Sequence, residues 1–84
     1  METNDPRAIA LGLEVRAEAA ARRVTLTELC KAAGVTRSAL YNYLDGERDM
    51  PYSVLNALAD ALRVRPFELV ERAEDRARRD ARKV

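Results

Sequence analysis

Apolar residues recur every three or four positions along most of the chain, which is the spacing of amphipathic α-helices. A first helix is expected to begin at Asp5-Pro6, because an aspartate side chain caps free N–H groups and proline costs no hydrogen bond in the first turn. It should end near Arg22-Arg23. Its apolar stripe consists of Ala8, Leu11, Gly12, Val15 and Ala19.

Two large apolar residues, Ile9 and Leu13, lie beside this stripe. They either widen the buried face or offer an apolar spot to a partner. We favour the wider core face, because large aliphatic side chains are more often buried than exposed.

The second helix carries strong local signals at both ends. Residues 25–28, Thr-Leu-Thr-Glu, form a capping box in which the Thr25 hydroxyl accepts from the N–H of Glu28 and the Glu28 carboxylate reaches back. The helix should therefore start at Leu26 and stop before Gly34, where a left-handed residue ends it. Its inward residues are Leu29, Cys30 and Ala33.

A third short helix is predicted from Arg37 to Leu44, capped by Thr36. Leu40 and Leu44 are four residues apart and should anchor it to the core, so that its other side chains face solvent. Asp45-Gly46 should end it.

Two more helices follow. Pro51 opens the fourth, whose stripe consists of Val54, Leu55, Leu58, Ala59 and Leu62. After a short link the fifth begins with an apolar set of Phe67, Val70, Ala73 and Ala77 and then becomes mostly charged. The pattern predicts an all-α fold with a disordered N-terminus (1–5), one domain (6–70) and a charged helical extension (71–84).

Size and composition narrow the possible functions. With 84 residues there is room for one modest core, so a deep active site is not expected. The single Cys30 and the absence of histidine argue against a metal site, and no cofactor or small-molecule ligand is predicted. Without a histidine, a reactive-cysteine setting or a phosphate-cradling glycine loop, an enzyme is not expected either. No apolar run spans a membrane and the polar N-terminus is unlike a signal peptide, which predicts a cytoplasmic protein.

The net charge of +1 hides an uneven distribution. Residues 1–21 hold two arginines against four acids, whereas residues 22–48 hold five basic residues against three acidic ones. Residues 63–84 hold eight basic residues against five acidic ones. The middle of the chain is therefore locally basic, as expected of a protein segment that binds nucleic acid.

The outer face of the third helix has the chemistry to recognise base edges. Arginine can donate to both acceptors of guanine, asparagine can pair with adenine, and serine can serve a base or a phosphate. These types occur here as Arg37, Ser38 and Asn42, next to Tyr41 and Tyr43. The two tyrosines are two positions apart and cannot face DNA equally, so one of them should pack against the protein.

Residues 24–64 resemble the XRE/Cro family of lambda-repressor-like DNA-binding domains. The likeness rests on the spacing of Leu29, Gly34-Val35, Leu40, Gly46, Leu58-Ala59 and Leu62. It implies five helices with the third in the major groove. Two positions depart from the family pattern: Leu26 stands where a phosphate-binding glutamine is usual, and Arg23 stands where a turn glycine is common.

The resemblance also assigns candidate DNA contacts. The residues expected to contact bases are Arg37, Ser38, Tyr41 and Asn42. The residues expected to contact the DNA backbone are Thr25, Thr27, Thr36, Tyr43, Arg48, Tyr52 and Ser53. The predicted function is a sequence-specific transcriptional regulator, and within that class a phage or bacterial repressor of the kind that maintains phage immunity. Its predicted partner is double-stranded operator DNA, so the cytoplasmic protein would join the nucleoid when bound. The alternative is a protein-interaction module, such as an antitoxin or adaptor, that uses its C-terminal helix.

The segment 71–84 admits three interpretations. A solvated helix supported by the i, i+4 pairs Glu68/Arg72, Glu74/Arg78 and Asp75/Arg79 is favoured. The second interpretation is a weak homodimer, formed either in free solution or only on DNA. Its contacts would be made by Val70, Ala73, Ala77 and Val84. The third is DNA backbone contact by Arg78, Arg79, Arg82 and Lys83.

Overall fold

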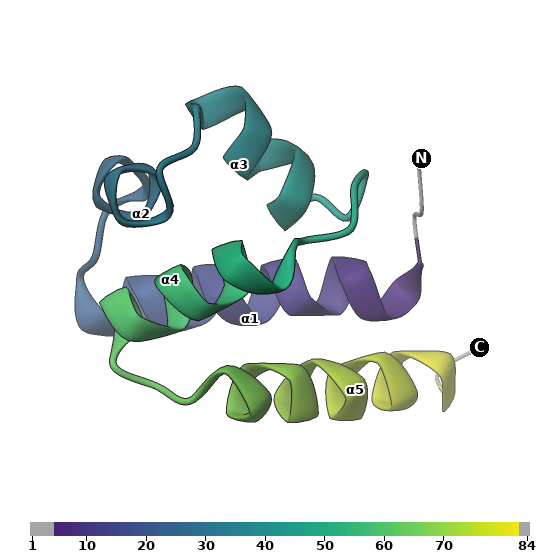
Figure 1. Cartoon of the computed structure of the whole chain (residues 1–84). Coiled ribbons are helices and arrows are strands. Elements are labelled where there is room, and N and C mark those ends of the chain that lie inside the picture. The colour runs from purple at the N-terminus through teal and green to yellow at the C-terminus, as the bar shows by residue number, and fades with distance from the viewer. Residues whose placement is uncertain (1–4, 83–84) are drawn as a thin grey trace.

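The computed structural model describes residues 5–82 and folds them into five α-helices (Figure 1). They are α1 (Pro6–Arg22), α2 (Leu26–Ala33), α3 (Arg37–Leu44), α4 (Tyr52–Leu62) and α5 (Pro66–Arg82). The helices α1 and α5 lie side by side in opposite directions, while α2 and α3 lie on the far side of α1 and α4 from α5. The predicted all-α, five-helix fold is confirmed.

Short-range signals fix most helix ends. The Asp5 carboxylate accepts from the backbone N–H of Arg7 at 2.8 Å, so α1 begins where the sequence predicted. Both hydrogen bonds of the Thr25 capping box are present, and Thr36 accepts from the N–H of Ala39. At α4 the prediction is one residue early, because Pro51 is extended and precedes the first helical residue, Tyr52.

Two arginines end helices in the left-handed conformation. Arg23 after α1 and Arg63 after α4 both have φ of 58°, and the N–H of each donates back to its own helix. A side chain costs roughly 1 kcal/mol in this region, which is why glycine is the usual residue there. Although Arg23 stands where the family usually has a glycine, its backbone adopts the left-handed conformation that glycine would favour at this corner.

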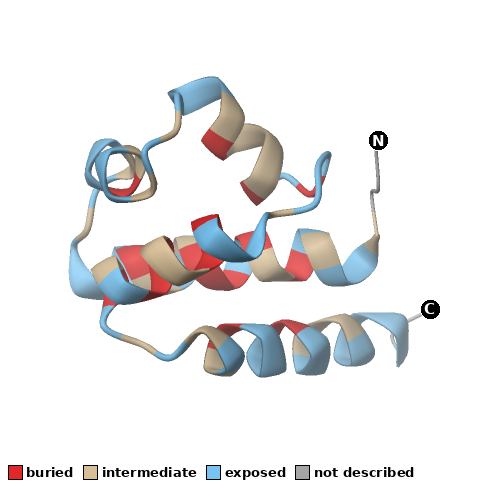
Figure 2. Cartoon of the chain, viewed as in Figure 1, coloured by how far each residue is buried: buried red, intermediate tan, exposed pale blue. Residues whose placement is uncertain are grey.

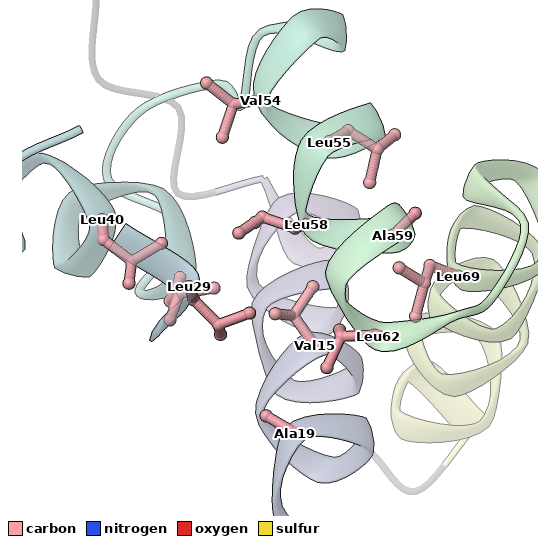
Figure 3. Packing of buried hydrophobic residues seen from close by; sticks show 11 residues of the cluster. Val15, Ala19, Leu29, Leu40, Val54, Leu55, Leu58, Ala59, Leu62 and Leu69 are labelled. Carbon is pink, nitrogen blue, oxygen red and sulfur yellow. The ribbon is translucent and has the colours of Figure 1, made fainter. Parts of the chain in front are cut away.

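The helix α4 lies in the middle of the core. All five residues of its predicted stripe are buried, and around them pack side chains from the other four helices, including Val15, Leu29, Leu40 and Leu69 (Figure 3). The buried faces of all five helices point toward this common centre (Figure 2). The core thus joins the N- and C-terminal helices to the middle of the chain.

The helix α1 is buried on two sides, which the sequence did not predict. Besides the expected Gly12, Val15 and Ala19, Ala10 and Glu14 are buried, and Glu14 pairs with Arg76 of α5. Ile9 and Leu13 occupy the remaining sector and are 38% and 41% exposed, so the wider core face that we favoured for them is wrong. The second buried face runs through Glu14 instead, because arginines on α5 neutralise it.

The helix α5 packs partly through residues other than those predicted: Ala73 is buried as expected, but Leu69 takes the place of Phe67 and Val70. Leu69 and Ala73 are its buried residues, whereas Phe67 is 59% exposed and Val70 is 36% exposed. The extension is also no freely solvated helix, since Arg72 and Arg76 bind α1. Of its predicted pairs, Glu68–Arg72 is present at 3.7 Å, while Asp75 pairs with Arg78 and not with Arg79. Lys83, Val84 and most of the predicted disordered N-terminus lie outside the described residues.

Candidate nucleic-acid interface

The helices α2 and α3 form a compact unit around Gly34. Gly34 is left-handed with φ of 66°, and the N–H of Val35 donates to the carbonyl of Cys30 across the corner. Leu40 and Leu44 are buried and fix α3 from below, while Arg37 and Ser38 at its start are exposed. The outer face of α3 is therefore presented on an anchored helix.

Close packing between α1 and the end of α3 holds this helix in place. A Cβ atom added to Gly12 would lie 1.7 Å from the carbonyl oxygen of Leu44 and 2.5 Å from its carbonyl carbon. Only a residue without a side chain permits this approach. The position of α3 is thus set by a backbone contact with α1, in addition to its apolar anchors.

The guanidinium of Arg37 has two partners on the α2–α3 surface. One nitrogen donates to the hydroxyl of Thr27 in α2, and the other donates to the hydroxyl of Tyr41, one turn along α3, at 3.4 Å. Both contacts are made at the solvent-exposed surface. Arg37, whose guanidinium is best suited to bind guanine, is therefore hydrogen-bonded to side chains of its own domain.

Tyr41 is in turn contacted by Arg16 of α1, a residue that the sequence analysis missed. The Arg16 guanidinium lies 5.9 Å from the centre of the Tyr41 ring and forms an ion pair with Asp45 at 3.1 Å. A cation over an aromatic face contributes on the order of 0.5–1 kcal/mol at exposed sites. Because Arg16 and Asp45 are 29 positions apart, no local pattern could have linked them.

The two tyrosines of α3 have different surroundings. Tyr43 packs against the hydrophobic core, whereas Tyr41 carries the two arginine contacts. The sequence predicted that one tyrosine would pack, and Tyr43 is that residue. Asn42 is half-buried, and its backbone carbonyl accepts from the N–H groups of Glu47 and Arg48, which folds the loop after α3 back onto the helix.

Apart from Tyr43, the residues predicted to contact the DNA backbone lie at the starts of α2, α3 and α4 and in the loop after α3. The hydroxyls of Thr25 and Thr36 accept capping bonds at the starts of α2 and α3, and that of Thr27 accepts from Arg37. The hydroxyls of Thr27 and Thr36 still have a proton to donate to a phosphate oxygen. The Thr25 hydroxyl already donates its proton to the Glu28 carboxylate. Arg48, Tyr52 and Ser53 are exposed in the loop after α3 and at the start of α4.

A family model described as a helix-turn-helix domain matches residues 10–74, which include α2, α3 and their corner. The chain belongs to this helix-turn-helix domain family. The sequence-based identification of a helix-turn-helix DNA-binding domain is thereby confirmed, while the narrower XRE/Cro assignment stays a prediction.

The fold of this helix-turn-helix domain is also found in a solved structure. The crystal structure of the clp gene regulator ClgR from Corynebacterium glutamicum matches with a TM-score of 0.87 and 23% sequence identity. The match covers 96% of this chain and 86% of that chain, so it extends to α5. Among curated proteins, none matches this sequence.

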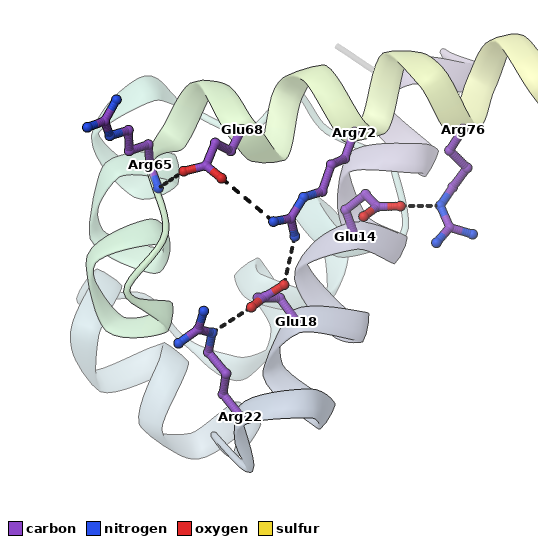
Figure 4. Close-up of polar contacts among 7 residues, drawn as sticks. All are labelled: Glu14, Glu18, Arg22, Arg65, Glu68, Arg72 and Arg76. Atoms are coloured by element: carbon purple, nitrogen blue, oxygen red, sulfur yellow. Dashed lines mark hydrogen bonds and ion pairs between the residues drawn. The ribbon is translucent and has the colours of Figure 1, made fainter.

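Two acidic side chains of α1 form ion pairs with arginines, two of them from α5. We call Glu14, Glu18, Arg22, Arg72 and Arg76 the α1–α5 ion-pair cluster (Figure 4). Glu14 is 9% exposed and accepts from Arg76 at 2.6 Å, and Glu18 accepts from Arg72 at 2.7 Å. Two acids of the acidic N-terminal segment are thus neutralised by α5.

Glu18 gives the stability of the domain a pH dependence. The guanidiniums of Arg22 and Arg72 donate to its carboxylate and hold the pKa of Glu18 below its ordinary value. The ion pairs therefore stabilise the folded state fully above the ordinary pKa, and this stabilisation is lost as the pH falls through the lowered pKa of the folded state.

We accordingly expect Glu18→Gln to lower the free energy of unfolding at neutral pH by about 1 kcal/mol or less, the value of partly exposed ion pairs. The difference from wild type should shrink in acid, from roughly pH 4.3 downward. Urea unfolding over a pH series measures it, and the exposed Glu71→Gln is the matched control. A difference that stayed constant from pH 7 to pH 3 would contradict the assignment.

Two further findings concern residues 5–82. Within that range no group of three or more cysteine and acidic side chains is arranged to hold a metal ion. No helix of the described chain is both long enough and apolar enough to cross a membrane. Cys30 is a free thiol, half-buried against the core beneath the α2–α3 corner, where it acts as a small packing residue.

Proposed function

We propose that this helix-turn-helix domain is a transcriptional regulator that recognises a specific double-stranded DNA sequence by inserting α3 into the major groove. The observation that carries the proposal is an anchored α3 whose exposed start presents Arg37 beside Ser38. A protruding, rigid helix with such side chains fits the width of the major groove. The regulator role of ClgR, a protein with the same fold, supports the regulatory part of the proposal.

Each candidate contact has a defined role in this proposal. Arg37 recognises a guanine through two hydrogen bonds, Asn42 recognises an adenine, and Ser38 donates to a base or phosphate. Arg48, Tyr52 and Ser53, which are exposed next to α3, bind phosphates and fix the position of the domain without specifying sequence.

The regulatory mechanism that we propose is repression. A bound domain of this size occupies a promoter and excludes the polymerase, as a phage or bacterial repressor of the XRE/Cro family does. A homodimer, formed weakly or only on DNA, would bind two half-sites about one helical turn apart. The symmetry of the selected DNA sequence tests this point.

Selection from a random duplex library, repeated with Arg37→Ala and at two salt concentrations, tests the proposal. We expect wild type to enrich one motif and Arg37→Ala to broaden a single position of it, at a cost of about 1–3 kcal/mol in affinity for the best site. Arg65→Ala is the charge-matched control, because this exposed arginine directly precedes α5, in a segment on the opposite side of the domain from α3 (Figure 1).

The opposite outcome is also defined. If wild type enriches no motif and binding disappears at moderate salt, the contact is nonspecific and the proposal fails. The alternative of a protein-interaction module would then be tested on α5, where Phe67 offers the largest exposed apolar surface of that helix.

A further inference from the structure

The exposed guanidinium of Arg37 is held in a fixed place before any DNA is present. An arginine side chain on a helix surface ordinarily samples many rotamers, and ordering it on binding costs conformational entropy. Here Thr27 from α2 and Tyr41 from α3 hold two of its nitrogens from different sides. The guanidinium is therefore ordered by contacts that belong to the free domain.

The contact with Thr27 is the more important of the two. The hydrogen bond with Thr27 links two helices across 10 positions of sequence, whereas that with Tyr41 is long at 3.4 Å and stays within α3. Thr27 is exposed and its hydroxyl makes no capping bond, so the start of α2 does not depend on it. Arg16 holds the ring of Tyr41 and so supports the second contact from α1.

The remaining donors of Arg37 stay available to DNA. Guanidinium has five N–H donors, and the contacts with Thr27 and Tyr41 occupy one on each terminal nitrogen. Two hydroxyl oxygens that accept from the same guanidinium fix its plane as well as its place. The plane matters because bidentate recognition of guanine requires two donors pointing in the same direction.

We propose that Thr27 is a positioning residue that orients Arg37 for guanine recognition, with Tyr41 as its second support. This inference rests on the proposed function and deepens it. It departs from the roles that the family resemblance implies, in which Thr27 contacts the DNA backbone and Tyr41 contacts bases. A phosphate ligand affects all DNA sequences equally, whereas a residue that orients Arg37 affects one base pair.

The test compares Thr27→Val, which keeps the shape and removes the hydroxyl, with Thr27→Ser, which keeps the hydroxyl. Binding is measured to the selected site and to the three variants of the base pair that Arg37→Ala broadens. We expect Thr27→Val to lower discrimination at this base pair about 3- to 10-fold, as loss of one hydrogen bond of ordinary strength does. Thr27→Ser should restore it, and Tyr41→Phe should give a smaller loss at the same base pair.

A double-mutant comparison makes the test sharper. In the Arg37→Ala background, Thr27→Val should change nothing further, because the group that it positions is gone. Equal discrimination by wild type and Thr27→Val would overturn the proposal. So would a uniform loss of affinity for all sequences with a weaker salt dependence, which would make Thr27 a phosphate ligand.

A measurement without DNA separates this proposal from the proposed function. NMR relaxation of the Arg37 Nε–H group in the free protein measures the motion of this side chain. We expect the motion to increase in Thr27→Val and to fall back to the wild-type level in Thr27→Ser. If wild type selects no DNA motif, the proposed function fails whatever the NMR shows. If Arg37 is as mobile in wild type as in Thr27→Val, the positioning role fails even though a motif exists.

Discussion

Replacing Gly12 with alanine is expected to destabilise the domain by about 3 kcal/mol, although helix propensity alone predicts the opposite sign. Alanine is favoured over glycine inside a helix by about 1 kcal/mol. The new Cβ, however, would lie 1.7 Å from the Leu44 carbonyl oxygen, far inside the contact distance of two atoms. Overfilling a packed contact costs about 1–3 kcal/mol, and the upper end applies here because the obstacle is backbone and not a flexible side chain.

The same substitution should weaken DNA binding beyond its effect on stability. The obstructing oxygen belongs to the last residue of α3, so relief of the clash moves α3 away from α1. Urea unfolding and binding to the selected site measure the two effects. Ala17→Gly, at an exposed position of α1, is the control and should cost only about 1 kcal/mol. A Gly12→Ala protein more stable than wild type would show that α1 and α3 do not meet at this point.

The second large effect is expected at α5. Leu69 is fully buried beside Leu62 and Ala59 of α4 (Figure 3), so Leu69→Ala should lower the free energy of unfolding by about 2–5 kcal/mol. Phe67→Ala removes a larger apolar side chain but one that is 59% exposed, and should change stability by only about 0.5 kcal/mol.

The pair of variants distinguishes two orientations of α5. The apolar pattern of the sequence placed Phe67 inward, whereas the structure buries Leu69. Thermal or urea unfolding of both variants decides between them. If Phe67→Ala proved the more destabilising of the two, α5 would be rotated about its axis and the contacts of Arg72 and Arg76 with α1 could not form as described.

Local signals made the centre of the domain predictable from sequence. The bounds of α3, from Arg37 to Leu44, follow from the Thr36 cap and from the leucines that anchor it, all within ten residues. The stripe of α4 was predicted completely because α4 is buried on one continuous face. Both cases depend on the order of neighbouring residues and not on which distant segment covers them.

The errors arose where two distant segments meet. Leu69 was overlooked because its burial depends on α4 and α1, and Ile9 was placed inward because the second face of α1 is covered only by α5. In the candidate site, too, local sequence predicted one part and contacts between separate helices determine the other. Its chemistry at Arg37 could be inferred from residue type, but the partners of that guanidinium, at Thr27 and Tyr41, depend on how α2 and α3 cross.

The pairing of the first helix with the last affects how the domain forms during synthesis. A chain leaves the ribosome from its N-terminus, so α1 through α4 emerge while the face of α1 around Glu14 is still bare. That face is completed only when Arg76 and the rest of α5 have also left the ribosome. The helix that we propose enters DNA is therefore made early, but it gains its full support only when α5 closes the structure.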